Sequence, residues 1–262
     1  MSAIPLPSSA GTYVYCVVAA ASFFQDALPW RARSIGGRGD LVRIVQFQDL
    51  AAVVSTSPAA HYDIGRENTL AHQLVIEEAM ARADVLPVRF GTVARSDQEV
   101  REKLLRRQFG ELHTLLDYVR GRVELGLKVF WNRERLFAEI AVESDEIRAL
   151  RDAIAGKSPE ETHYQRIQLG QLTEQALLRK RDREAEAILH ALRPPAVEAR
   201  VNRVLTDTMV LNAAFLVDRT QEWLFDAQVN ALDDTHAGRL LLKYVGPLPP
   251  YNFVNLIVHW ED

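Results

Sequence analysis

Cysteine is nearly missing from this 262-residue chain, which contains only Cys16. A single cysteine cannot form an internal disulfide, so nothing in the sequence points to an oxidising compartment. Because Cys16 lies in an apolar run, we interpret it as a buried strand residue and not as a reactive thiol. A basic excess is missing too, since 31 Lys and Arg stand against 35 Asp and Glu. This balance argues against a nucleic-acid partner.

Long hydrophobic runs are also absent. The longest run, Val14 to Phe24, has about half the length that a membrane span requires. Residues 1–11 have no basic region before an apolar stretch and do not resemble a secretory signal. They are rich in Pro, Ser and Ala, so we expect a loose extension. The sequence therefore predicts a cytoplasmic protein without a membrane span.

Catalytic motifs are missing from the sequence as well. There is no phosphate loop of the GxxxxGK[ST] type and no GxSxG, and the glycines of residues 34–40 do not fit GxGxxG. None of the 7 histidines forms an i, i+4 pair or an HExxH motif. Adjacent acids such as Glu160 and Glu161 face different directions on a helix and make poor acid–base partners. We predict a protein that is not an enzyme, with no catalytic residue, metal or cofactor.

In the first half of the chain, hydrophobic patterns predict a series of strands and helices. Ser96 and Glu99 form a capping box, which predicts the start of a further helix. That helix has apolar residues at spacings of 4, 3, 4 and 3 from Leu105 to Val119, and Gly121 is a good stop signal. The expected elements are a strand at 12–20, a short helix at 22–28, a hairpin at 41–47 and 50–56, a well-buried helix at 66–83, a strand at 85–94 and a helix at 97–120.

The second half repeats this pattern and contains one long helix. A second capping box, Ser158 with Glu161, predicts a helix at 159–193 that ends before Pro194. At about 1.5 Å per residue the helix is roughly 50 Å long. Its charged middle, residues 179–186, must be solvated or paired, so the helix can protrude. The other expected elements are a strand at 123–131, helical structure at 133–155, strands at 197–205 and 209–217, a helix at 220–233, a strand at 239–246 and a last strand or short helix at 253–260.

The order of these elements, βαββαβ twice, is that of the ferredoxin-like arrangement. It predicts an α+β fold of two domains, each an antiparallel sheet with helices on one face. We expect an N-terminal domain at 1–121, in which helix 97–120 connects the two halves. A C-terminal domain at 122–262 would carry the long helix 159–193.

Two further segments allow two interpretations each. Arg89 stands between apolar strand residues, so it is either an ion-pair partner of Glu77 or Glu78 or part of an anion site, and we favour the structural ion pair. Residues 246–253 (GPLPPYNF) are either a docking segment in extended form or a rigid turn that packs Tyr251 and Phe253 on the core. Packing is the interpretation that we favour.

Several motifs together resemble the F/L family of gas vesicle proteins (GvpF/GvpL). They occur in the family's order, cover residues 12–256 and look nearer the F branch than the L branch. The segments are TYVYCVV, AHQLVIEEAM with VLPVRFGTV, ELGLKVFW, GQLTEQALLRKRD, TDTMVLNAAFLV and GPLPPYNFV.

The resemblance implies a minor gas vesicle component or assembly factor with a two-domain α+β fold. Its partners would be the small, very hydrophobic major shell protein, whose aggregation it would limit, and other gas vesicle accessory proteins. A strand edge or an apolar groove could bind this client, and we rank a sheet edge first and the long helix second. The alternative is a small-ligand-binding regulator or enzyme, since ferredoxin-like folds also host these. In that case polar groups should converge in a pocket near Arg89 and Glu78.

Overall fold

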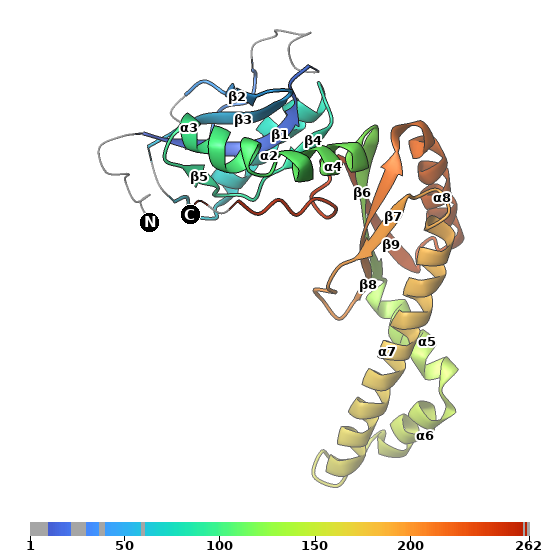
Figure 1. Cartoon of the computed structure of the whole chain (residues 1–262). Helices are drawn as coiled ribbons and strands as arrows, with labels where there is room; N and C mark the ends of the chain where they lie inside the picture. Colours follow the sequence, from blue (N-terminus) through green and yellow to red (C-terminus); the bar gives the residue numbers. More distant parts are fainter. Residues whose placement is uncertain (1–9, 22–29, 37–39, 59–60, 259, 261–262) are drawn as a thin grey trace. The chain divides into compact units, whose positions relative to one another are not determined.

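The computed structural model describes residues 10–21, 30–36, 40–58, 61–258 and 260, and it is an α+β protein with two sheets (Figure 1). The chain divides into two compact units. Unit 1 comprises residues 1–124 and 247–262, and unit 2 comprises residues 125–246. The short helix expected at 22–28 and most of the expected extension at 1–11 lie outside the described residues.

The sheet of unit 1 has the strand order β2-β3-β1-β4, and β5 also pairs with β1. Each of these pairings is antiparallel, and β2 and β3 form the expected hairpin. Read from the other edge, β4-β1-β3-β2 is the order of a split βαβ arrangement, in agreement with the expectation. The strands are β1 Gly11–Ala19, β2 Arg43–Phe47, β3 Leu50–Ser57, β4 Val85–Pro87 and β5 Val93–Ala94.

Strand β1 is buried on both faces, which explains its unbroken apolar sequence. Tyr13, Tyr15 and Cys16 belong to one core cluster, and Val14 and Val17 belong to another. Strict alternation would place Tyr15 and Cys16 on opposite faces. The pairing register with β3 shifts between Val14 and Cys16, and this bulge turns the two neighbours to the same face.

Helices cover both faces of this sheet, so the prediction of helices on one face was wrong for unit 1. Helix α2 packs in the cluster with Tyr13, whereas η1, a π-helical segment, and α4 pack in the cluster with Val14. Residues 97–120 were expected to connect two domains and are instead a second layer of unit 1, broken near Arg107 and Gln108. Ser96 caps this segment by accepting the Glu99 amide at 3.2 Å, and Gly121, with φ +65°, ends it. The helices are α2 Arg66–Met80, α3 Asp97–Glu99, η1 Val100–Arg106 and α4 Phe109–Val119.

Helix α2 is less buried than its sequence predicts. Its buried face consists of His72, Val75, Ile76 and Ala79. Leu70 and Leu74 are 49% and 43% exposed. The prediction of a helix buried around its circumference was wrong, because only one side of α2 contacts the sheet.

The sheet of unit 2 has the order β7-β8-β6-β9, which again corresponds to the split βαβ order. Helix α8 packs on it through Phe225, whose ring centroid lies 5.0 Å from that of Phe215 in β8. Strand β7 is shorter than expected. The elements are β6 Arg122–Trp131, β7 Glu198–Val201, β8 Met209–Asp218, β9 Leu240–Leu248, η2 Arg219–Gln221 and α8 Glu222–Thr235.

Three helices connect β6 to β7. Helical structure was expected at 133–155, but it is interrupted at Ser144, whose hydroxyl accepts the Ile147 amide at 3.3 Å and starts a new helix. The predicted box of Ser158 and Glu161 forms two hydrogen bonds of 3.3 Å just before the long helix. This helix continues past the sheet of unit 2, and the two shorter helices lie beside its far half (Figure 1). They are α5 Arg133–Glu143, α6 Asp145–Ile154 and α7 His163–Leu192.

The last segment of the chain belongs to unit 1, not to the C-terminal domain that was expected at 122–262. Val254 and Leu256 join the core beneath η1 and α4, and Leu256 forms a parallel bridge with Val88. Glu124, only 2% exposed, accepts hydrogen bonds from the backbone amide of Asn252 at 2.7 Å and its side-chain amide at 2.6 Å. Of the two residues predicted to pack on the core, Phe253 is buried, in unit 1, whereas Tyr251 is 37% exposed.

We expect Glu124→Ala to destabilise unit 1, because it removes the acceptor for two buried donors of Asn252. Hydrogen bonds to charged groups of this kind contribute about 2–3 kcal/mol. Urea unfolding should show this loss. Glu111→Ala, at an exposed position of α4, should change the unfolding free energy by less than about 0.5 kcal/mol. Equal stability of the two variants would contradict this role of Glu124.

Candidate functional site

The predicted ion pair of Arg89 with Glu77 or Glu78 is not formed in the part of the chain that the structure describes. Arg89 is exposed because β4 ends at Pro87, so that Arg89 lies in the following turn. Glu78 pairs instead with Arg82 at 2.5 Å. The carboxylate of Glu78 also accepts the backbone amides of residues 31 and 32, and Glu77 accepts from Gln73 at 2.7 Å.

Arg89 does lie at a pocket of about 430 Å³ in unit 1. Helix α2, the turn after β4 and the C-terminal segment form its walls. The lining residues are Thr69, His72, Gln73, Pro87, Val88, Arg89, Phe90, Tyr251, Val254, Asn255 and Leu256. Burial raises the pKa of the Tyr251 phenol, which is already protonated at neutral pH at its ordinary value of 10.

His72 is the buried polar residue of this pocket and is only 5% exposed. Its Nδ1 lies 3.0 Å from the Tyr13 hydroxyl, and the ring also hydrogen-bonds the backbone of Val88. Burial lowers the pKa of His72 to about 4, although the bond to Val88 opposes this shift. The imidazole is therefore neutral at physiological pH and is held in place by the core, so we interpret it as a structural residue.

The larger hollow is a groove of about 920 Å³ in unit 2. Helix α7 lines it over some four turns with residues that recur every three or four positions from Arg166 to Arg181. At about 1.5 Å per residue this stripe is roughly 22 Å long. The lining residues are Arg133, Leu136, Ile154, Arg166, Leu169, Gly170, Thr173, Glu174, Leu177, Leu178, Arg181, Thr206, Asp207 and Thr208.

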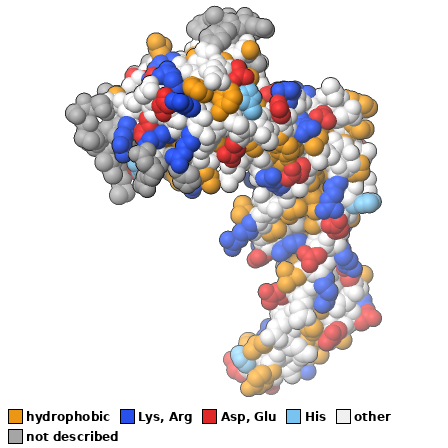
Figure 2. Space-filling model, viewed as in Figure 1, with side chains coloured by type: hydrophobic (Ala, Val, Ile, Leu, Met, Phe, Trp, Pro, Cys, Tyr) orange, Lys and Arg blue, Asp and Glu red, His pale blue; other side chains and the backbone are white. Residues whose placement is uncertain are grey.

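The groove combines half-exposed leucines with arginines. Leu169 and Leu177 are partly buried, and Leu178 is 47% exposed. In the face that Figure 2 shows, hydrophobic side chains lie among charged ones along unit 2. Gly170 leaves open space, because no atom would lie within 4 Å of a Cβ added there. The groove is therefore open at Gly170.

Arg181 marks one end of the groove. Its Nη2 donates to the Asp207 carbonyl at 2.8 Å, and its guanidinium carbon lies 5.7 Å from the ring centroid of Trp131. Its Nε is buried and has no hydrogen-bond partner among the described residues. A buried donor without a partner is uncommon in folded proteins.

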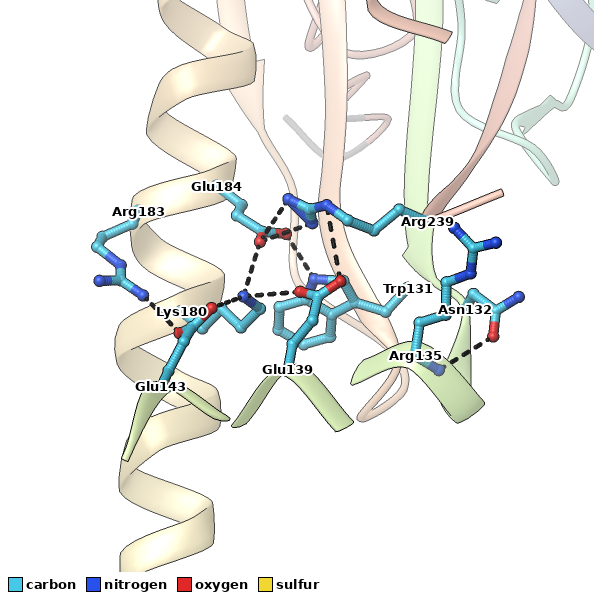
Figure 3. Close-up of polar contacts among 9 residues, drawn as sticks. All are labelled: Trp131, Asn132, Arg135, Glu139, Glu143, Lys180, Arg183, Glu184 and Arg239. Carbon is cyan, nitrogen blue, oxygen red and sulfur yellow. Dashed lines mark hydrogen bonds and ion pairs between the residues drawn. The ribbon is translucent and has the colours of Figure 1, made fainter. Parts of the chain in front are cut away.

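Beside the groove, a cluster of charges around the buried Lys180 joins α5 to α7 (Figure 3). Lys180 is 5% exposed. Its Nζ lies 2.5 Å from Glu143, 2.9 Å from Glu139 and 3.4 Å from Glu184. Arg239 also binds Glu184, at 2.8 Å, and the Trp131 indole donates to Glu184 at 2.5 Å. The charged middle of the long helix was expected to be either solvated or paired, and Lys180 and Glu184 are paired.

These contacts shift the pKa of two members of the cluster. Burial alone would lower the pKa of Lys180, but the hydrogen bonds to Glu143 and Glu139 outweigh it and raise that pKa. The bond from Lys180 lowers the pKa of Glu143. The pair therefore stabilises the folded state between the ordinary values of 4.5 for Glu and 10.5 for Lys. Its contribution is lost as pH falls through the lowered pKa or rises through the raised one.

Neither hollow gathers an evident catalytic set. The described residues that line the groove include no histidine, cysteine or serine. Over the described ranges of the chain, no group of three His, Cys, Asp or Glu side chains is placed to hold a metal ion. No helix within those ranges is both long and apolar enough to cross a membrane. What the geometry offers is a binding surface.

The sequence contained part of the signal for this site. Glu139 and Glu143 stand four apart on one helix, as do Lys180 and Glu184 on another, and this spacing places each pair on one face. The stripe from Arg166 to Arg181 was visible in the same way. The packing of α5 against α7 belongs to the tertiary structure and cannot be predicted from the spacing of residues in either helix.

We expect stability to fall between pH 7 and pH 5 because of His72. The unfolded histidine binds a proton near its ordinary pKa of 6.5, whereas the folded one does so near 4. The unfolded state is therefore favoured as pH falls, by about 2 kcal/mol over this range. Urea unfolding of His72→Gln, which does not titrate, should lack this component. An equal pH dependence in both proteins would contradict the assignment.

We also expect Lys180→Met to destabilise unit 2, because three carboxylates then lose their shared cation. Lys180 is buried, but Glu139 and Glu143 are 26% and 44% exposed, so the expected cost is about 1.5–3 kcal/mol, as for hydrogen bonds to charged groups. Arg179→Met is the matched control on the exposed side of the same helix and should cost less than about 0.5 kcal/mol. Guanidinium unfolding followed by circular dichroism measures both. A loss no greater than that of the control would show that the cluster contributes little.

Comparisons with known proteins identify relatives along nearly the whole chain. The family model described as Gas vesicle synthesis protein GvpL/GvpF matches residues 11–255. Gas vesicle protein F of Nostoc sp. is 29% identical over 95% of this chain and 99% of its own length. Gas vesicle protein F of a Streptomyces sp. is 32% identical over 93% of this chain and 99% of its own length. The crystal structure of gas vesicle protein GvpF from Anabaena sp. aligns with a TM-score of 0.80 at 27% identity, over 95% of this chain and 100% of that one.

These matches confirm the resemblance that the sequence motifs indicated. The fold, the motifs and the family model agree over both units and over the segment that returns to unit 1. The chain therefore belongs to the GvpL/GvpF family of gas vesicle proteins.

Proposed function

We propose that this protein is a non-catalytic, cytoplasmic assembly factor of gas vesicles that binds the hydrophobic major shell protein. By covering apolar surface of the shell protein, it would limit aggregation while vesicles nucleate. Family membership supports the link to gas vesicles, and the groove of unit 2 carries the proposal of a client. An apolar helix laid into an apolar groove is a common mode of recognition.

The client would lie along α7. A stripe of roughly four turns matches a client helix of similar length. Leu169, Leu177 and Leu178 would contact its apolar face, and Gly170 lets its backbone approach closely. This mode needs neither metal nor nucleophile.

We favour the groove over a sheet edge, which was ranked first from the sequence. Strand β7 is short and carries the exposed ion pair of Arg200 with Glu198 at 2.7 Å. Strand β9 contains Pro247, and proline cannot donate to a sheet ladder. The C-terminal segment bridges Leu256 to Val88 just after β4. Proteins usually protect sheet edges from added strands by short strands, charged residues, proline or a covering segment. Strands β7, β9 and β4 each have at least one of these features.

We expect the purified protein to suppress light scattering by aggregating shell protein at near-equimolar amounts, since a binder acts by mass action. Gly170→Leu should weaken suppression, because the new side chain enters the groove without meeting another part of the chain. It should not weaken the helix, since Gly is less favourable than Leu there by up to about 1 kcal/mol.

Gly110→Leu is the matched control, because Gly110 is also an exposed helical glycine with open space around it and lies in unit 1. It should suppress scattering as the unchanged protein does. Equal activity of Gly170→Leu would exclude the groove as the client site. Suppression at a tiny fraction of the client, or one that depends on a nucleotide, would favour an enzyme instead. A lack of any effect or pull-down would refute the shell protein as client.

A further inference from the structure

The pocket of unit 1 shares no lining residue with the groove of unit 2. Its interior is mostly apolar, and the neutral ring of His72 closes it on the side of α2. Because the imidazole is engaged by Tyr13 and Val88, it contributes no charge to a ligand. The apolar lining consists of Pro87, Val88, Phe90, Val254 and Leu256.

One positive charge stands at this pocket. Arg89 is exposed and makes no ion pair with any described residue. Of the nearby acids of α2, Glu78 pairs with Arg82, whereas Glu77 accepts a hydrogen bond from the neutral Gln73 and keeps its charge near Tyr251. The guanidinium of Arg89 is therefore available to an external anion, and its planar fork suits a carboxylate in particular.

Two neutral hydrogen-bonding groups accompany Arg89. Thr69, from the first turns of α2, and Asn255, from the C-terminal segment, are both exposed and line the same pocket. Within the described part of the chain, neither side chain makes a hydrogen bond. A few polar groups around an apolar hollow of several hundred Å³ are typical of a ligand site.

The apolar surface continues outside the pocket. Leu70 and Leu74 of α2 are exposed, and they neighbour Thr69 and Gln73 of the lining. Since Leu70 and Leu74 are four residues apart, they lie on one face of the helix. A free organic acid would fill only the pocket, whereas a peptide could also cover these leucines.

We propose that this pocket binds a short, apolar peptide segment of a partner protein that carries a carboxylate. The carboxylate pairs with Arg89, and a neighbouring apolar side chain enters between Phe90 and Leu256. The flanking residues of the peptide lie over Leu70 and Leu74. This site is independent of the groove, and its test involves no shell protein.

Fluorescence polarisation with two labelled pentapeptides tests the proposal on the full-length protein. One has the sequence Gly-Leu-Glu-Leu-Gly, and the other has Lys in place of Glu. The acidic peptide should bind saturably, and Arg89→Gln should weaken binding about tenfold, as expected for loss of a charge-assisted pair. Thr69→Trp, which narrows the pocket from an exposed position, should weaken it as well.

Arg95→Gln is the matched control, since Arg95 is exposed in the same unit but does not line the pocket. It should leave binding unchanged, and thermal unfolding should show that all variants are folded. Equal binding of the lysine peptide, or no effect of Arg89→Gln, would overturn the role of the carboxylate. Isovalerate that binds as tightly as the acidic peptide would overturn the peptide assignment in favour of a free-acid site.

Discussion

Lys180 is the residue on which the binding surface of unit 2 depends. Its ammonium group has three donors and contacts three carboxylates, two from α5 and one from α7 itself. Because α5 also supplies Leu136 to the groove, the cluster fixes one groove wall against α7. Glu184 also binds Trp131, the last residue of β6, and Arg239, which directly precedes β9, so the cluster contacts the sheet of unit 2. A charge cluster and not an apolar core thus holds together the two helices that line this partly apolar groove.

Local patterns were enough to predict most elements and their order. The capping boxes at Ser96 and Ser158 both form, and Gly121 has the positive φ that a helix stop favours. The apolar run of β1 correctly indicated a buried strand. The caps and the helix stop depend on neighbours within about four residues, so the sequence contains the whole of their signal.

Features that depend on distant segments were not predictable from the sequence. Arg89 was expected to lie in a strand and to form an ion pair with an acid. Its side chain is exposed instead, because β4 ends two residues earlier. The sequence did contain the spacing of Glu139 and Glu143, yet only the fold shows that both meet Lys180. The return of residues 247–258 to unit 1 has no periodic signature, because the segment is mostly irregular.

That return has a consequence for synthesis on the ribosome. Unit 2 is an insertion between Glu124 and Pro247 of unit 1. Domains generally fold as the chain emerges, N-terminal first. Here the N-terminal core cannot be completed at that stage, because Val254 and Leu256 are among its last residues to be made. Unit 2 can therefore be finished first, while the earlier part of the chain waits for its closing segment.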